Sequence, residues 1–125
     1  MINLRKIVFS KVSPLCSNLF YEEAPQDTAY PYVVFSFPSN GRAYKGQVQR
    51  ELELAIYDAP KSGYNVATAI DNLADEITRV LDYTTGAQGD LSAWFKFEQR
   101  TEIPFPDGTT MWGRILRFTA HTYKE

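Results

Sequence analysis

The side chains that could do acid–base or nucleophilic chemistry are few in this sequence. His121 is the single histidine and Cys16 is the single cysteine. A histidine titrates near neutral pH and a thiolate is a nucleophile, but each needs a positioned partner group to act in catalysis. No companion motif accompanies either residue. We therefore expect His121 to be a half-exposed strand residue and Cys16 to be a buried structural thiol, and we predict no catalytic residue and no enzyme activity.

Metal and cofactor sites lack candidates for similar reasons. A structural zinc site takes four ligands, mainly Cys and His, and this chain offers two such residues. Asp71, Asp75 and Glu76 fall on the polar side of a predicted helix, as expected of a solvated face. Gly41 and Gly46 lack the strand, the glycine motif and the following Lys-Ser/Thr pair of a phosphate-binding loop. We predict no metal and no cofactor.

A basic and aromatic stretch is the most partner-like local feature. Arg42, Tyr44, Lys45 and Arg50 lie in or just after a glycine-containing connection over residues 39–46. We predict an extended hairpin there, with the first three of these residues at its tip. The tip could bind phosphates or an acidic protein surface, or it could be an ordinary solvated loop, and the pattern leaves these alternatives open. The free edges of a small sheet are a second predicted contact surface, because unpaired strands invite pairing with a neighbour.

Hydrophobic periodicity predicts two helices. Apolar residues recur every three to four positions over 2–15, and Pro14 places the end of this helix between residues 12 and 17. The same period over 65–82 predicts a long amphipathic helix.

Alternating apolar and polar residues predict strands over 33–37, 48–57, 91–100 and 110–123, with a short apolar segment at 19–21. Residues 22–28 and 84–90 are predicted loops, and 104–108 is a predicted turn. The element order predicts an α+β fold in which a small antiparallel or mixed β-sheet of four to five strands carries two main helices on one face. One domain over residues 1–125 is expected, with a core that includes Leu52, Leu54, Leu73, Ile77, Phe97 and Phe118.

Composition excludes several classes of protein. The charge is nearly balanced, with 13 basic and 15 acidic residues, which argues against a dedicated nucleic-acid binder. A content of 44% hydrophobic and 14% aromatic residues argues against disorder. No apolar run approaches the roughly 20 residues of a membrane span, and the first residues do not form a secretory signal, so no membrane contact is expected.

Four stretches carry a resemblance to a known family, in the same order along the chain. They are residues 21–35 (YEEAPQDTAYPYVVF), 51–58 (ELELAIYD), 69–75 (AIDNLAD) and 106–118 (PDGTTMWGRILRF). Together they resemble the tail completion proteins of long-tailed bacteriophages, within the broader group of tail terminators and head–tail joining proteins. The chain departs from that pattern at Tyr57, where tryptophan is common, and in a first helix that is richer in Lys, Arg and Ile.

The resemblance implies a virion structural protein of the tail or neck, made in the cytoplasm of the host bacterium. Such proteins form a ring, typically a hexamer, that caps the head-proximal end of the tail tube, ends tube growth and joins the tail to the head. The implied partners are other copies of the chain, the major tail tube protein and a head–tail connector or stopper protein, with DNA only in transit through the channel. The candidate contact residues are Arg42, Tyr44, Lys45, Arg50, Tyr30, Tyr32 and Trp112.

Three alternatives remain beside this reading. One is a small α+β enzyme or ligand-binding domain that uses His121. Another is a nucleic-acid-binding module that uses the 42–50 hairpin. The third is a related neck or connector joining protein that contacts DNA.

Overall fold

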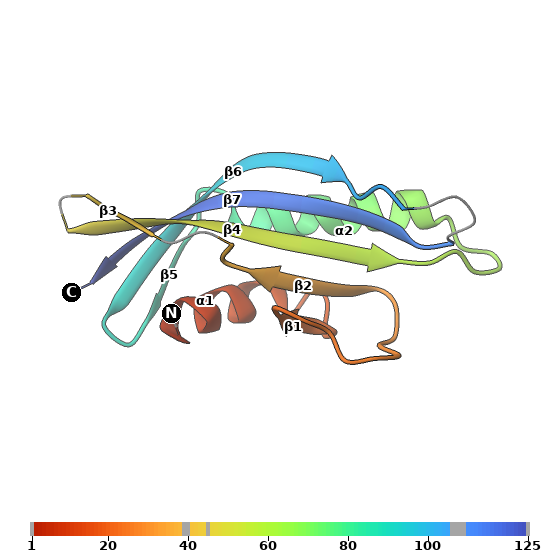
Figure 1. Ribbon diagram of the computed structural model, residues 1–125, viewed down its shortest axis with the longest axis horizontal. Helices are drawn as coiled ribbons and strands as arrows, with labels where there is room; N and C mark the ends of the chain where they lie inside the picture. Colours follow the sequence, from red (N-terminus) through yellow and green to blue (C-terminus); the bar gives the residue numbers. More distant parts are fainter. Residues whose placement is uncertain (1, 39–40, 45, 106–109, 125) are drawn as a thin grey trace.

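The computed structural model describes residues 2–38, 41–44, 46–105 and 110–124. Helix α1 (Ile2–Val12) and strand β1 (Leu19–Tyr21) come first, followed by β2 (Tyr32–Ser36), β3 (Arg42–Tyr44) and β4 (Gln47–Asp58). Helix α2 (Val66–Leu81) precedes β5 (Thr85–Gln88), β6 (Leu91–Glu102) and β7 (Trp112–Lys124), as Figure 1 shows. The predicted α+β class is confirmed.

All the described strands belong to one mixed sheet. Its order is β1-β2-β4-β7-β6-β5, and β3 pairs with the first residues of β4 outside this path. Among the described strands, β1 and β2 form the one parallel pair, and the other pairs are antiparallel. The longest pairing joins β4 to β7, from Gln47 opposite Tyr123 to Asp58 opposite Trp112.

The prediction of four to five strands is wrong, because six strands lie in the continuous order and β3 adds to them. Strand β5 falls in the segment predicted as a loop. It forms a tight hairpin with β6, in which Gln88 faces Leu91 and Gly89 takes a φ of 61°. Its small residues have a packing role, since a Cβ on Gly86 would lie 2.6 Å from Cγ2 of Ile7 in α1.

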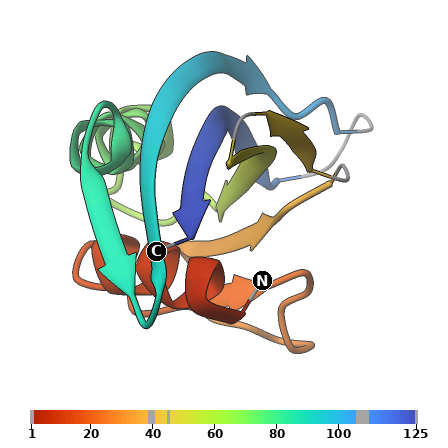
Figure 2. The same cartoon turned by 90° about the vertical axis from the view of Figure 1, so that its left-hand side faces the viewer.

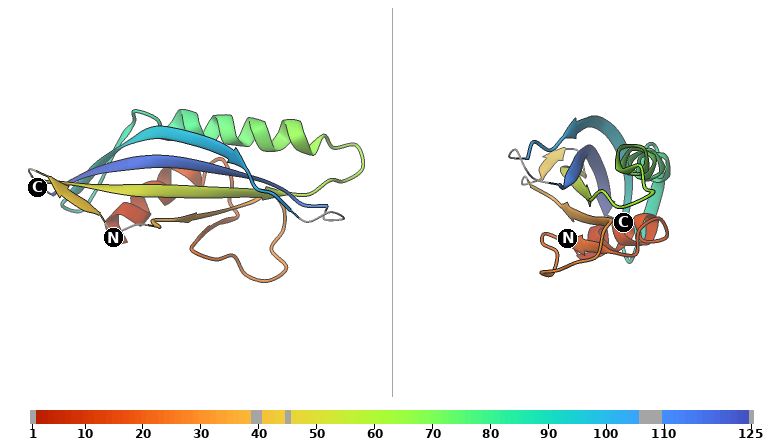
Figure 3. Two further views of the ribbon diagram at one scale, coloured as in Figure 1. Left: turned by 45° about the horizontal axis from the view of Figure 1, so that its top comes forward. Right: turned by 90° about the vertical axis from the view of Figure 1, so that its right-hand side faces the viewer.

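The core lies on one face of the sheet. Leu52, Leu54 and Ile56 alternate along β4 and are fully buried, as are Leu116 and Phe118 of β7. Both helices bury their apolar sides in this same cluster, and the sheet curls with the helices on one side of it (Figures 2 and 3). The predicted core is confirmed in these elements: its other members are Ile77, which is buried, and Leu73 and Phe97, which are partly buried against the cluster.

The helices begin and end near the predicted positions. Asn65 caps α2, because its side-chain oxygen accepts a hydrogen bond from the backbone N–H of Thr68 at 3.1 Å. Helix α1 ends at Val12, two residues before Pro14, and contacts both β1 and β5, the two edge strands of the order. Among the described residues, neither helix is long and apolar enough to cross a membrane.

Candidate interaction surfaces

The predicted contact residues fall into two groups at opposite ends of β4. Arg42 faces Gln49 near the start of this strand. Tyr32 faces Tyr57, and Trp112 faces Asp58, at its end. Ten residues separate Gln47 from Tyr57, which corresponds to roughly 33 Å along a strand. The sequence had offered these residues as one set of contacts, and the structure does not bring them together.

At the first end, the hairpin is tighter than predicted. Arg42 and Tyr44 belong to strand β3, which pairs with β4, and are therefore not in an open tip. Gly46 lies in the short connection between β3 and β4 and has a φ of +80°. Two-residue hairpin turns commonly use positive φ, because such turns match the right-handed twist of the two strands. Lys45 lies outside the described residues. We call residues 42–50 the basic hairpin.

At the other end, aromatic rings form a row on the outer face of the sheet, opposite the helices. The ring centroids of Tyr30 and Tyr32 are 5.5 Å apart, and those of Tyr32 and Tyr57 are 5.0 Å apart in a stacked arrangement. Phe105 continues the row at 6.5 Å from Tyr57. Burial raises the pKa of both Tyr32 and Tyr57, so these phenols are neutral at physiological pH.

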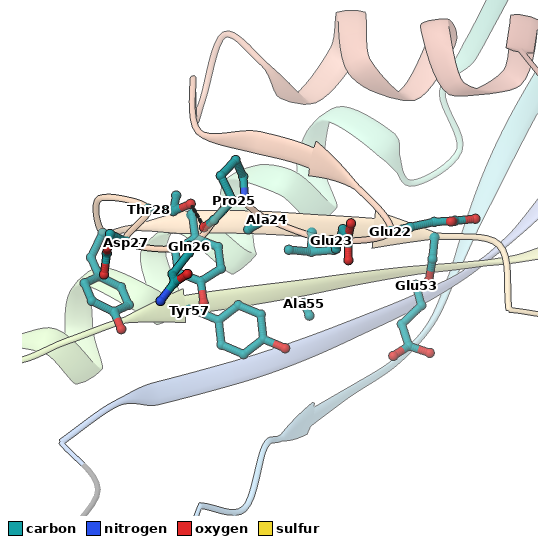
Figure 4. A pocket seen from close by; sticks show the side chains of 14 residues that line it. Glu22, Glu23, Ala24, Pro25, Gln26, Asp27, Thr28, Glu53, Ala55 and Tyr57 are labelled. Atoms are coloured by element: carbon teal, nitrogen blue, oxygen red, sulfur yellow. Dashed lines mark hydrogen bonds between the residues drawn. The ribbon is translucent and has the colours of Figure 1, made fainter.

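A cavity of about 790 Å³ lies beside this row. Its floor comes from the outer faces of β2 and β4, and its wall is the connection between β1 and β2 (Figure 4). Four carboxylates line it, and none of its lining residues is Lys, Arg or His. We call this cavity the acidic groove; its lining residues are Glu22, Glu23, Ala24, Pro25, Gln26, Asp27, Thr28, Tyr30, Tyr32, Val34, Ser36, Glu53, Ala55 and Tyr57.

The wall of the acidic groove is anchored at both of its ends. The N–H of Glu22 donates to the carbonyl of Phe35 at 2.9 Å. The side-chain amide of Asn18 donates to the carbonyl of Ala29 at 3.2 Å, and the carbonyl of Asn18 accepts from the N–H of Val33 at 2.9 Å. Between these anchors, the hydroxyl of Thr28 donates to the carbonyl of Pro25. The carboxylates of the wall are therefore carried on a segment with defined ends.

Sequence reasoning missed the acidic groove although it identified the 22–28 loop. Glu22 and Glu23 belong to that loop, and no contact was predicted for them. In the structure both are exposed at the rim of the groove. Only the parallel pairing of β1 with β2 brings the loop over the sheet, and this pairing has no signal in the local sequence.

His121 is half-buried on the outer face of β7, as predicted. Its ring stacks on Trp94 with centroids 3.9 Å apart and planes at 5°, and its Nδ1 lies 2.9 Å from Oε1 of Gln47. Burial lowers its pKa below the ordinary value, so the ring is neutral at pH 7. Within the described residues, no group of three or more His, Cys, Asp or Glu side chains could hold a metal ion.

The two remaining residues singled out in the sequence are Trp112, which lies beside a buried arginine, and Cys16, which is buried. Trp112 is 38% exposed, and its ring lies 5.7 Å from the guanidinium of Arg114. Arg114 is buried and its Nε lies 3.1 Å from a carboxylate oxygen of Asp71, which ties β7 to α2. Cys16 is buried as predicted, and burial raises the pKa of its thiol.

No family model matches this sequence, and no curated protein matches it. The fold, however, occurs in solved structures. One similar chain comes from a structure described as the virion of a native gene transfer agent (GTA) particle. The TM-score is 0.66 at 12% sequence identity, and the match covers 96% of this chain and 94% of the other. At this identity the similarity establishes a shared fold over nearly the full length of both chains.

Proposed function

We propose that this chain is a structural protein of a phage-like virion and that it acts as a tail terminator. In this role, copies of the chain form a ring, typically of six subunits, on the head-proximal end of the tail tube. The ring ends tube growth and joins the tail to a head–tail connector or stopper protein. DNA passes through its channel, and the chain catalyses no reaction.

The observation that carries the proposal is the shared fold with a chain of a virion particle. The match leaves little of either chain uncovered, so the two proteins correspond as whole units. The four ordered sequence stretches that resemble tail completion proteins support the narrower role. They are independent of the structural match because they were identified from residue types alone.

The arrangement of the surfaces suits a ring subunit. A closed ring is built from heterologous contacts, in which a surface at one end of a subunit meets a different surface at the other end of its neighbour. This chain is elongated (Figure 1), and the first residues of β4 and its second half carry different polar surfaces. A net charge of -2 is compatible with DNA that passes through the channel without binding strongly.

Electron microscopy of the purified protein mixed with tail tubes tests the proposal. The tubes are assembled from the major tail tube protein that the same genome encodes. We expect a ring of density at one end of each tube and a tube length that stops increasing once the protein is added. Tubes that keep growing with bare ends would contradict the proposal. A protein that is monomeric before it meets a tube would not, because the tube end can template the ring.

A further inference from the structure

We propose that the exposed side of helix α1 in one subunit packs against the acidic groove of the next subunit. This inference rests on the proposed ring, and it goes further by assigning the two surfaces that meet between neighbouring copies of the chain. We call the first surface the α1 face; its residues are Ile2, Arg5, Lys6, Phe9 and Ser10.

Helix α1 has apolar residues on its exposed side as well as on its buried side. Ile2 and Phe9 point away from the core and are 63% and 47% exposed. The buried residues of α1 are Leu4, Ile7, Val8 and Val12. The exposed residues of α2, in contrast, are all polar: Thr68, Asn72, Asp75, Glu76 and Arg79. A helix that is apolar on both sides is typically buried on both sides, so we expect a partner to cover the α1 face.

The α1 face is also cationic. Residues 1–21 include Arg5, Lys6 and Lys11 and no Asp or Glu. The guanidinium of Arg5 lies 4.0 Å from the ring centre of Tyr21, and neither Arg5 nor Lys6 appears in the ion pairs found among the described residues. A cavity of about 330 Å³ beside Phe9 continues this surface toward β1 and β2. The partner that fits the α1 face therefore combines carboxylates with apolar or aromatic groups.

The acidic groove has this complementary composition. Three of its four carboxylates appear in none of the ion pairs found among the described residues; they are Glu22, Glu23 and Asp27. The rings of Tyr30, Tyr32 and Tyr57 lie along the same groove, and Tyr30 is 43% exposed. Its volume of about 790 Å³ is large enough to receive several side chains of a helix. The carboxylates can thus face Lys6 of a neighbour, and the rings can pack against its Phe9.

The two surfaces lie on opposite faces of the sheet. Val33 and Phe35 of β2 are buried in the same core cluster as the apolar side of α1. The residues that alternate with them, Tyr32, Val34 and Ser36, line the acidic groove on the other face. Strand β2 therefore separates the α1 face from the groove within one subunit. The helix side of one copy and the sheet side of the next form a heterologous contact, and repetition of such a contact can close a ring.

Engineered cysteines test this contact in the assembled particle. Ser10 on α1 and Gln26 in the groove wall are both exposed, whereas the native Cys16 is buried and serves as the unreactive background. Rings are formed on tail tubes and treated with a short bismaleimide. We expect the Ser10→Cys/Gln26→Cys double variant to give a ladder of covalent oligomers up to the full ring. An equal mixture of the two single variants should give covalent dimers and nothing larger, and neither single variant alone should give any.

The results that would overturn the inference differ in meaning. Tubes capped by the double variant without covalent products would reject this contact and leave the proposed function intact. Dimers formed by Ser10→Cys alone would show an isologous contact between two α1 helices and would also reject it. Cross-links from Ser10→Cys to the tail tube protein would reject it by assigning the α1 face to that partner. Wild-type protein that never caps tubes would remove the proposed function and this inference together.

Charge reversal gives an independent measurement that needs no engineered cysteine. Lys6 and Glu23 are both exposed. We expect Lys6→Glu or Glu23→Lys alone to raise the protein concentration that caps half of the tubes by at least about tenfold, because each places like charges together. The two reversals combined should bring this concentration back to within about twofold of wild type. Lys96→Glu is the matched control, since this exposed lysine on β6 belongs to neither surface and should not change the concentration. Failure of the combined variant to recover, with its urea unfolding unchanged, would contradict the contact.

Removal of the exposed phenylalanine tests the apolar part of the contact. Phe9→Ser should raise the half-capping concentration by about tenfold, because the ring no longer packs against the tyrosines of the neighbour. Tyr83→Ser is the matched control, since Tyr83 is 68% exposed and belongs to neither surface. An unchanged concentration for Phe9→Ser, or an equal rise for both variants, would contradict packing of α1 in the groove.

Discussion

Truncation of Phe118 tests the register of the central strand. Phe118 of β7 is fully buried and lies opposite Leu52 of β4 on one side and Phe97 of β6 on the other. Its ring meets that of Phe97 edge to face, with centroids 5.5 Å apart. Few positions have a neighbour of this size on both sides, so the Phe118→Ala substitution should leave a cavity that the sheet cannot collapse to fill.

The expected cost follows from the lost contacts. Burial and cavity formation for Phe→Ala amount to about 3–5 kcal/mol. The aromatic pair with Phe97 contributes about 0.5–1.5 kcal/mol beyond its area, which favours the upper part of that range. With an unfolding entropy of about 2.1 cal/mol/K per residue, a loss of about 4 kcal/mol in a chain of 125 residues lowers Tm by about 15 °C. Urea unfolding followed by tryptophan fluorescence measures the free energy directly.

The neighbouring residue supplies the control. Thr119 points to the outer face, where its hydroxyl donates to Glu98 at 3.0 Å in an exposed position. Thr119→Ala should therefore cost less than about 1 kcal/mol. A one-residue slip of β7 would exchange the two faces. Equal costs for the two variants, or a larger cost at Thr119, would refute the assignment of faces in this sheet.

Three further predictions concern α2, a turn and the edge of the sheet. Asn65→Ala removes the N-cap of α2 and should lower the free energy of unfolding by about 0.5–2 kcal/mol in urea titrations, and an unchanged midpoint would contradict the cap. The hydroxyl of Tyr64 donates to the carboxylate of Asp58, which raises the pKa of Tyr64 to about 12 from 10. Because the neutral phenol is favoured in the folded state, this contribution to stability is present below pH 10 and is lost as the pH rises toward 12. Ultraviolet titration of Tyr64→Phe should therefore lack one phenol near pH 12, and the loss of one that titrates near pH 10 would contradict the bond. Gly86→Val forces a side chain against Ile7 of α1 and should lower stability by about 1–3 kcal/mol, whereas a Tm equal to that of wild type would show that α1 does not pack there.

Local periodicity predicted the helices well because their signals are contained in a few turns of chain. The apolar period of α2 and the stop at Pro14 in the first helix act over neighbouring residues, and the observed ends agree with them. Strands β3 and β5 were missed because they have only 3 and 4 residues, too few to show an alternating pattern. They become strands only by pairing with β4 and β6, which the local sequence does not specify.

The sequence predicted which residues make contacts but not where these residues lie relative to one another. Tyr30, Tyr32 and Arg50 were named from their types and their positions near loops. Their separation into two ends depends on the length and register of β4, and the acidic groove depends on the pairing of β1 with β2. Glu22 and Glu23 gained significance only when that pairing placed them beside the tyrosine row.

The length of tail tubes in particles made without this chain tests the central claim most directly. The gene is deleted from the genome that encodes it and then restored from a plasmid, and tube lengths are measured by electron microscopy. The account predicts tubes longer than normal and heads without tails after deletion, with normal length and joining after restoration. Tubes of normal length joined to heads in the absence of the chain would contradict it.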